Sequence, residues 1–185
     1  MSNSIMIDLE TLDTSVNATI VSMAAVCFDP FQDYENSSVK LYDLTQLHLL
    51  IDIESQPTRT INPDTIKWWS QQDQAVQDSI FGEGLVRVSL QEALSQLHKF
   101  IWNKADRIWA QGTTFDISML EHAYAQYNMP RPWPYWQVRD SRTIIDLVSV
   151  KQPKVTHDAM DDCFRQLIAV QKVLRTLGVQ KFVRN

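Results

Sequence analysis

The first part of the chain alternates between runs of apolar, β-branched residues and short polar turns. Residues 4–9 and 19–28 are two such runs, separated by the turn-forming residues Asp13, Thr14 and Ser15. Residues 46–53 form a third run of this kind. We therefore predict two adjacent strands at 4–9 and 19–28 and a third strand at 46–53.

Helical signals begin at Asn62-Pro63, where an N-cap residue is followed by proline at the first helical position. This predicts a helix that runs through Trp68 and Trp69. Residues 89–92, Ser-Leu-Gln-Glu, form a capping box that opens a second helix. Its apolar residues fall on a single stripe: Leu90, Ala93, Leu94, Leu97 and Ile101.

Strands and helices then alternate along the second half of the chain. The pattern predicts strands at 107–111 and 136–139, and helices at 115–127 and 141–148. A last long helix begins near Asp158 and ends at Gly178, a residue typical of helix C-termini. Strands that come first and then alternate with helices indicate an α/β fold with a mixed central sheet.

The composition fits a single domain that spans residues 1–185. With 44% hydrophobic residues, a chain of 185 residues can bury a substantial core. Its two cysteines, Cys27 and Cys163, show no C-x-x-C spacing, which favours a reducing compartment. We find neither a secretory signal pattern nor the ~18 consecutive apolar residues of a membrane span. We therefore expect a cytoplasmic protein with no membrane partner.

The net charge of −5 at first argues against a nucleic-acid partner, which usually selects a basic surface. The argument weakens if four of the acids are metal ligands. Setting those four aside changes the formal charge from −5 to −1, and two divalent cations would neutralise the site itself. A nuclease remains compatible with this composition, but a long nonspecific groove for the nucleic-acid backbone is not favoured.

Two acids stand at the end of the first predicted strand. Asp8 and Glu10 are two positions apart, so the pleat directs both carboxylates to the same face of the sheet. Side-by-side carboxylates repel each other unless a cation lies between them. An Asp-x-Glu pair is common by chance, and an exposed strand end is the alternative interpretation. The apolar residues that precede the pair favour the end of a buried strand.

Two further acids lie at the starts of predicted helices. Asp116 follows a strand and a Gly-Thr-Thr turn, where an acid could also simply complement the helix dipole. Asp162 lies five residues after His157, a spacing that does not place the two on one helical face. We expect His157 in a mobile loop before the last helix and Asp162 pointing inward from that helix. Asp158 and Asp161 fit a cap and a first-turn residue.

Taken together, these motifs resemble the three exonuclease motifs of the DEDDh superfamily, which includes ribonuclease T, oligoribonuclease and polymerase proofreading subunits. The order, spacing and setting agree over nearly the whole chain. The matching motifs are Asp8-Leu9-Glu10-Thr11, then Phe115-Asp116, then His157 with Asp162.

A compact branch of bacterial and phage 3'-5' exonucleases is similar in further stretches. That branch includes the mycobacterial-type exoribonuclease and phage exodeoxyribonucleases. The stretches are 109–112 leading to Phe115-Asp116, the run 132–136 (Pro-Trp-Pro-Tyr-Trp) and the run 139–143 (Arg-Asp-Ser-Arg-Thr). One departure concerns the first loop, where family members often carry glycine and this chain has Leu12 and Asp13.

The resemblance implies a ribonuclease H-like, mixed five-stranded sheet flanked by helices. It also implies hydrolysis of phosphodiester bonds from the 3' end of single-stranded DNA or RNA, releasing nucleoside 5'-monophosphates. Two Mg²⁺ or Mn²⁺ ions would be held by four carboxylates, which are suitable hard-oxygen ligands. Asp8 would bridge both ions, Glu10 and Asp162 would hold the ion that carries the attacking water, and Asp116 would contribute to the other. His157, with an ordinary pKa near ~6.5, would accept the proton of that water.

Aromatic and basic residues are candidates for substrate contacts. A base stacked on an aromatic ring contributes ~1–3 kcal/mol with little sequence preference, although tryptophans more often fill the core. Trp68 and Trp69 point about 100° apart on a helix, so we expect only one of them to be buried. The cluster Trp133, Tyr135 and Trp136 is a second aromatic candidate, and Arg139 and Arg142 could hold a phosphate or form surface ion pairs. The predicted substrate-contacting set is Thr11, Leu12, Trp69, Phe115 and Arg142.

Several alternatives remain open at this level. The chain could be a binding module or scaffold of the same fold that has lost catalysis, or a metal-dependent phosphatase or endonuclease. No residue is committed to recognising a 2'-hydroxyl, so the sequence does not decide between DNA and RNA. A homodimer is expected only from the resemblance. His48, His98 and His122 have no acidic partner at metal-ligand spacing and are treated as ordinary residues.

Overall fold

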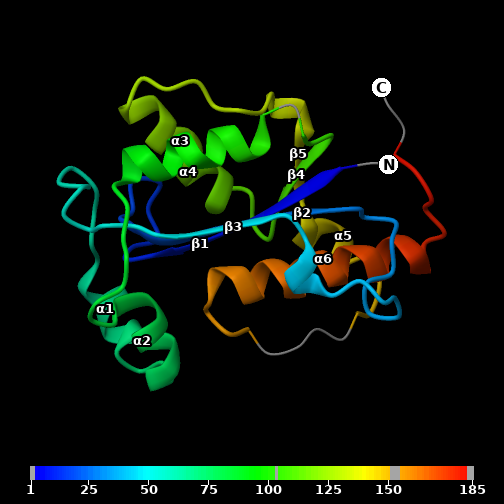
Figure 1. Ribbon diagram of the computed structural model, residues 1–185, viewed down its shortest axis with the longest axis horizontal. Coiled ribbons are helices and arrows are strands. Elements are labelled where there is room, and N and C mark those ends of the chain that lie inside the picture. The colour runs from blue at the N-terminus through cyan, green and yellow to red at the C-terminus, as the bar shows by residue number, and fades with distance from the viewer. Residues whose placement is uncertain (1–2, 103, 151–154, 183–185) are drawn as a thin grey trace.

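A mixed five-stranded sheet forms the centre of the molecule (Figure 1). This is a computed structural model that describes residues 3–102, 104–150 and 155–182. The strand order is β3-β2-β1-β4-β5, and β1 pairs antiparallel with β2 but parallel with β4. The strands are β1 (Ser4–Thr11), β2 (Ile20–Phe28), β3 (Gln46–Leu50), β4 (Arg107–Ala110) and β5 (Val138–Asp140). The predicted α/β fold with a mixed five-stranded sheet is confirmed.

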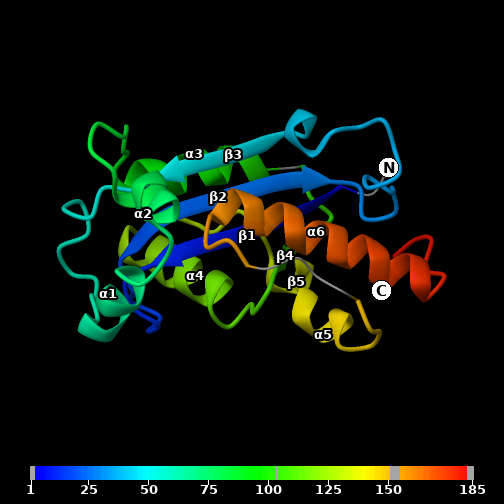
Figure 2. The ribbon, with the colours of Figure 1, turned by 90° about the horizontal axis from the view of Figure 1, so that it is seen from below.

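Helices cover both faces of the sheet. Helices α3 and α4 lie on one face, α5 and α6 lie on the other, and α1 and α2 stand beyond the end of β1 (Figures 1 and 2). The helices are α1 (Pro63–Trp69), α2 (Gln74–Phe81), α3 (Leu90–Ile101), α4 (Asp116–Gln126), α5 (Ser141–Ile145) and α6 (Ala159–Thr176), with 3-10 turns at Leu41–Asp43 and Tyr135–Gln137. None of the helices in the described part of the chain combines the length and apolar composition needed to cross a lipid bilayer.

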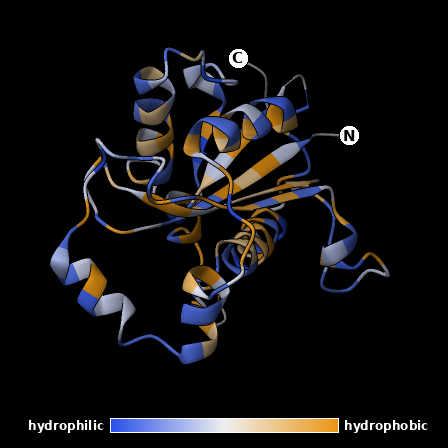
Figure 3. Ribbon diagram, turned by 60° about the vertical axis from the view of Figure 1, so that its left-hand side comes forward, coloured by the Kyte–Doolittle hydropathy of each residue, from blue (hydrophilic) through white to orange (hydrophobic). Residues whose placement is uncertain are grey.

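The period-2 alternation of β1 divides the core in two. Ile5, Ile7 and Leu9 belong to the cluster packed under α3 and α4, whereas Met6 belongs to the cluster that α6 covers. Figure 3 shows hydrophobic residues along the central strands, while the surrounding helices alternate between hydrophobic and hydrophilic residues. Asp8 and Glu10 share the parity of Met6, so both carboxylates project on the α6 side of the sheet.

Side-chain caps confirm three predicted helix starts. The Asn62 side chain accepts a hydrogen bond from the Asp64 N–H at 2.9 Å, and Ser89 Oγ accepts one from the Glu92 N–H at 3.2 Å. Asp158 Oδ1 accepts bonds from the N–H groups of Met160 and Asp161 at 3.0 and 3.1 Å. These residues therefore fix where α1, α3 and α6 begin.

The structure differs from the predicted elements in several places: β1 extends to Thr11 rather than ending at residue 9, and α5 ends at Ile145 rather than at residue 148. Helix α2 was not predicted, because its apolar residues are few and pack on Trp69 in a small satellite cluster. Strand β3 ends at Leu50 because Ile51 makes its own bridge to Val88. The fifth strand begins at Val138 rather than at residue 136, because a 3-10 turn follows Pro134.

Candidate active site

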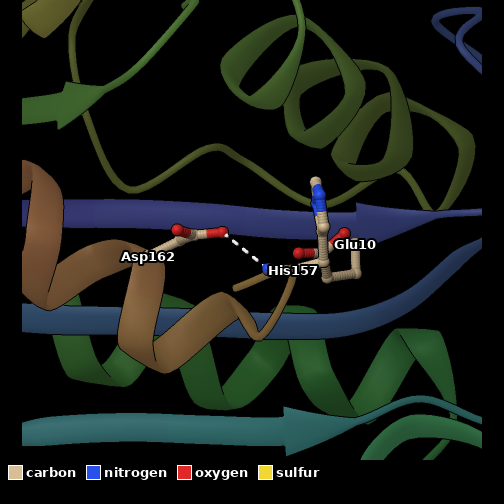
Figure 4. A group of neighbouring side chains, drawn as sticks. All are labelled: Glu10, His157 and Asp162. Carbon is tan, nitrogen blue, oxygen red and sulfur yellow. Dashed lines mark hydrogen bonds between the residues drawn. The ribbon is translucent and has the colours of Figure 1, made fainter. Parts of the chain in front are cut away.

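Four acids from three separate chain segments converge on the α6 side of β1. Asp8 and Glu10 come from β1, Asp116 is the first residue of α4, and Asp162 lies in the first turn of α6. Side-chain ligand atoms of Glu10, His157 and Asp162 all lie within 4.8 Å of one another (Figure 4). The structure thus brings Glu10, His157 and Asp162 together as the sequence predicts. Asp8 and Asp116 are not part of this group of ligand atoms, but their charges interact with each other and with its acids.

An opening between β1 and β4 makes room for this group. The two strands pair only from Ser4 to Met6 on β1, so the second half of β1 is unpaired on its β4 side. There the Asp116 carboxylate accepts a hydrogen bond from the Leu9 N–H at 3.1 Å. Gly112, with φ 113°, turns the chain from β4 towards α4, a conformation that side chains rarely allow. The site therefore lies where two parallel strands separate at their carboxyl ends, a common place for ligands in α/β sheets.

Helix α6 holds two of the acids in place. Asp162 Oδ1 accepts from Arg165 Nε at 2.8 Å, and its Oδ2 accepts from the His157 N–H at 3.2 Å. One turn further on, Gln166 Nε2 donates to Asp8 Oδ1 at 2.6 Å. Arg165 and Gln166 are not predicted as site residues from the sequence, although their positions three and four residues after Asp162 place them on its face of the helix.

His157 occupies an unusual backbone conformation. Its φ is 58°, in the left-handed region that few residues other than glycine adopt. Its ring meets the indole ring of Trp68 edge to face, with 4.7 Å between ring centroids and 88° between planes. The residue lies in the bend before α6, as predicted, with its imidazole beside Glu10 (Figure 4).

Burial and mutual repulsion raise the pKa values of the acids. Burial raises the pKa of Asp8 well above its ordinary value, and the neighbouring carboxylates raise it further. Burial, followed by the charges of Asp162 and Asp116, raises the pKa of Glu10 to about 8. Burial raises the pKa of Asp116 to about 7, although the Leu9 N–H bond lowers it. The fully ionised cluster is therefore costly unless positive charge is supplied.

These shifts predict that the metal-free protein loses stability as the pH rises. An acid whose pKa is higher in the folded chain than in the unfolded chain takes up a proton on folding. Its contribution to stability is complete below the unfolded pKa of ~4 and is lost as the pH rises, up to about 8 for Glu10. With chelator, we expect the free energy of unfolding to be a few kcal/mol lower at pH 8 than at pH 5, on the order that shifts of this size imply. Urea titrations at both pH values measure the difference.

The control for this prediction is Glu10→Gln, which removes the titrating group. We expect the pH dependence in chelator to flatten in this variant. An identical slope in the variant and the wild type would contradict the assignment. Added Mg²⁺ should restore stability to the wild type at pH 8.

The donor set fits divalent cations. Glu10 and Asp162 offer carboxylate oxygens close to the His157 ring nitrogens, and Asp8 and Asp116 add two interacting carboxylates. Carboxylates are the hard oxygen ligands that Mg²⁺ and Mn²⁺ prefer. Arg165 supplies one positive charge, through its ion pair with Asp162. Arg142 also acts on Asp116 and lowers its pKa. The four acids outnumber these two cations, and metal ions can supply the remaining positive charge.

A pocket of about 480 Å³ adjoins the acids on the α1 side. Among the residues predicted to contact substrate, Thr11, Trp69 and Phe115 line it. Leu12 is buried behind it, in the cluster around Trp69. Arg142 lies outside the pocket, beside Gly112, and donates to the Gln111 carbonyl at 3.1 Å.

The paired tryptophans divide as predicted, with Trp69 buried and Trp68 38% exposed. Trp69 Nε1 donates to the Thr11 carbonyl at 2.9 Å, which anchors it. In the second aromatic group, Trp133 is buried, whereas Tyr135 and Trp136 are exposed. That group lies outside the pocket.

Comparison with known proteins agrees with this geometry. Exonuclease I of E. coli in complex with a dT13 oligonucleotide superposes with a TM-score of 0.65 and 12% identity, over 96% of this chain and 43% of that chain. The zinc-ion-bound form of the E. coli exonuclease I–ssDNA complex gives 0.65 and 13%, over 95% and 41%. This chain spans less than half the length of those proteins, and the likeness establishes the ribonuclease H-like fold.

Sequence comparison identifies the family. The model of the 3'-5' exoribonuclease Rv2179c-like domain matches residues 3–174, and the chain belongs to this family of 3'-5' exonucleases. An exodeoxyribonuclease of Enterobacteria phage T4 is 23% identical over 204 residues, covering 91% of this chain and 88% of the phage protein. The predicted superfamily and enzyme class are confirmed.

Proposed function

We propose that this protein is a two-metal 3'-5' exonuclease that removes nucleoside 5'-monophosphates from single-stranded 3' ends. The observation that carries the proposal is the cluster of Glu10, His157 and Asp162 beside a pocket of about 480 Å³, with the charges of Asp8 and Asp116 acting on it. Strand β1, the start of α4 and the start of α6 each supply part of the site, so the arrangement depends on how these distant segments pack. Residues 1–185 would act as a single exonuclease domain.

Divalent cations, when bound, would polarise the phosphoryl group and lower the pKa of a bound water. We assign Asp8 to both ions, Glu10 and Asp162 to one, and Asp116 to the other. Hydrogen bonds from Gln166 to Asp8 and from Leu9 N–H to Asp116 orient two of these carboxylates. Such outer contacts hold ligands in one direction and thereby reduce the cost of assembling the site.

His157 would act as the general base. Its imidazole lies next to Glu10 and Asp162, where the attacking water would be held. The neighbouring carboxylates favour the imidazolium that forms when the proton is transferred. Proton transfer by a positioned side chain typically contributes ~10²–10⁴-fold to the rate.

The pocket supports a single-stranded end as the substrate. It is lined by Phe115 and Trp68 on apolar walls, which could hold a base, and by Glu10 at the side of the acids. Two known proteins support the same class: the similar structure of E. coli exonuclease I holds a dT13 oligonucleotide, and the phage T4 relative is an exodeoxyribonuclease. The family description names an exoribonuclease, so DNA and RNA are both proposed substrates.

The proposal predicts a ladder of shortened products from a 5'-labelled strand. Matched single-stranded DNA and RNA oligonucleotides, labelled at either end, are incubated with Mg²⁺, Mn²⁺ or chelator. We expect 5'-labelled strands to shorten stepwise, 3'-labelled strands to release labelled mononucleotide, and chelator to stop both. The relative rates rank DNA against RNA.

Circular and 3'-blocked strands are the controls for this assay. An exonuclease needs a free 3' end, whereas an endonuclease does not. Cleavage of either control would contradict the proposal and favour an endonuclease. Binding of both polymers without cleavage would favour a catalytically silent module of the same fold.

A further inference from the structure

An aromatic chain connects α1 and α2 to His157. Ring centroids are 5.3 Å apart between Phe81 and Trp69, 5.0 Å between Trp69 and Trp68, and 4.7 Å between Trp68 and His157. All three contacts are edge to face, with interplanar angles of 81°, 75° and 88°. Edge-to-face contacts favour particular angles between rings, so each ring restricts the orientation of the next.

The inner end of this chain is firmly anchored. Trp69 is 3% exposed, and its Nε1 donates to the Thr11 carbonyl at the end of β1. Trp68 directly precedes it in the sequence and is packed against its ring. The indole that touches His157 is thus held relative to the strand that carries Asp8 and Glu10.

His157 is restrained through its backbone and through its side chain. Its backbone N–H donates to Asp162, which holds the main chain in the left-handed conformation. Its imidazole ring is restrained by the contact with Trp68. A base must lie within hydrogen-bond reach of the proton that it removes, so the direction of this ring matters for catalysis.

We propose that Trp68 is a positioning residue that holds the imidazole of His157 in its catalytic direction. This inference rests on the proposed role of His157 as the base. Trp68 also lines the pocket next to the acids, so a nucleotide bound there would contact the same indole that touches His157. Through this contact, α1 and α2 would affect the rate of hydrolysis, although neither helix supplies an assigned metal ligand.

A double-mutant cycle tests the proposal on single-stranded oligonucleotides with Mg²⁺. The variants are Trp68→Leu, Trp68→Phe, His157→Ala and the double variant Trp68→Leu/His157→Ala. We expect Trp68→Leu to lower kcat about tenfold, because a misplacement of ~1 Å can cost up to ~10²-fold. In the His157→Ala background, the same substitution should change kcat by less than about twofold, because coupled residues are not additive.

Two further variants complete the design. Trp68→Phe keeps an aromatic ring at the contact and should retain at least about half of kcat. Trp102→Leu is the matched control, since Trp102 is also exposed and stacks on a histidine, His98, far from the acids. It should leave kcat unchanged.

Equal losses in the two backgrounds would overturn the proposal, because Trp68 would then act on the substrate directly. A rise in KM with unchanged kcat would overturn it as well. The imidazole proton resonances of His157 provide a readout that needs no activity, since the ring current of Trp68 should shift them and Trp68→Leu should remove that shift. An inactive wild type would refute the proposed function, whereas an unmoved resonance would refute the contact.

Discussion

Replacing Asp8 by Asn is expected to abolish exonuclease activity, with a loss of about 10³-fold or more, while leaving the fold intact. The substitution removes a carboxylate assigned to both cations, and electrostatic groups at such centres are among the largest contributors to catalysis. Asn can still accept the hydrogen bond from Gln166 Nε2. The rate is measured on 5'-labelled single strands at saturating Mg²⁺.

The same substitution should stabilise the metal-free protein. Burial and the nearby carboxylates raise the pKa of Asp8, so a neutral amide relieves part of the repulsion. We expect the melting temperature in chelator to rise relative to wild type and the stabilisation by Mg²⁺ to shrink. A variant with normal activity would remove Asp8 from the metal site.

Asp161→Asn is the matched control for this experiment. Asp161 lies next to Asp162 in the first turn of α6 but is exposed. It carries the same charge at nearly the same place without belonging to the assigned ligands. Its replacement should change the rate by less than about threefold, as expected for an exposed charge.

Replacing His157 by Ala should lower kcat by about 10²–10³-fold, within the range typical of a lost general base. A histidine accepts a proton only when neutral, so the wild-type rate should fall as the pH drops through the range in which this residue becomes protonated. In the variant, that acidic limb of the pH–rate profile should disappear. Rates between pH 5 and pH 9 measure it, at a metal concentration that is saturating at each pH so that protonation of Glu10 and Asp116 does not empty the site.

Persistence of the wild-type acidic limb in His157→Ala would contradict the assignment of the base. His98→Ala serves as the control, because His98 stacks on Trp102 outside the site. Its pH–rate profile should match that of the wild type. Binding of a single strand in the presence of Ca²⁺ should be similar in both variants, which separates chemistry from affinity.

The strand pattern predicted the sheet because local signals and long-range packing agree. Residues 4–9 and 19–28 are mostly apolar and bounded by turn residues, and all of them except Asp8 and Cys27 are buried. The caps at Asn62, Ser89 and Asp158 were equally predictable, since each is a local hydrogen bond. Helix α2 was not, because its stability depends on packing against Trp69 rather than on its own periodicity.

The acids could be selected from sequence only as a set. Each motif alone is weak, and their order and spacing made the combination specific. The helical spacing from Asp162 places Gln166 on the same face, but its hydrogen bond to Asp8 could not be foreseen, because it crosses the helix–sheet interface. The choice between Trp68 and Trp69 also needed the structure, since the 100° between adjacent residues does not say which one faces the core. The contact between Trp69 and substrate stays a prediction. The neighbouring Trp68 is more exposed than Trp69.

The distribution of the proposed ligands along the chain has a consequence for folding. Asp8 and Asp162 come from the first strand and the last helix, so a pair of bound ions would close almost the entire polypeptide into one loop. Closing a long loop restricts the unfolded chain in the way that a disulfide does, and both cysteines in this chain are free. The bound ions would thus serve as a reversible cross-link. The stabilisation that they give would depend on the free metal concentration relative to the dissociation constant. The resistance of the protein to unfolding should therefore follow the free Mg²⁺ concentration of its surroundings.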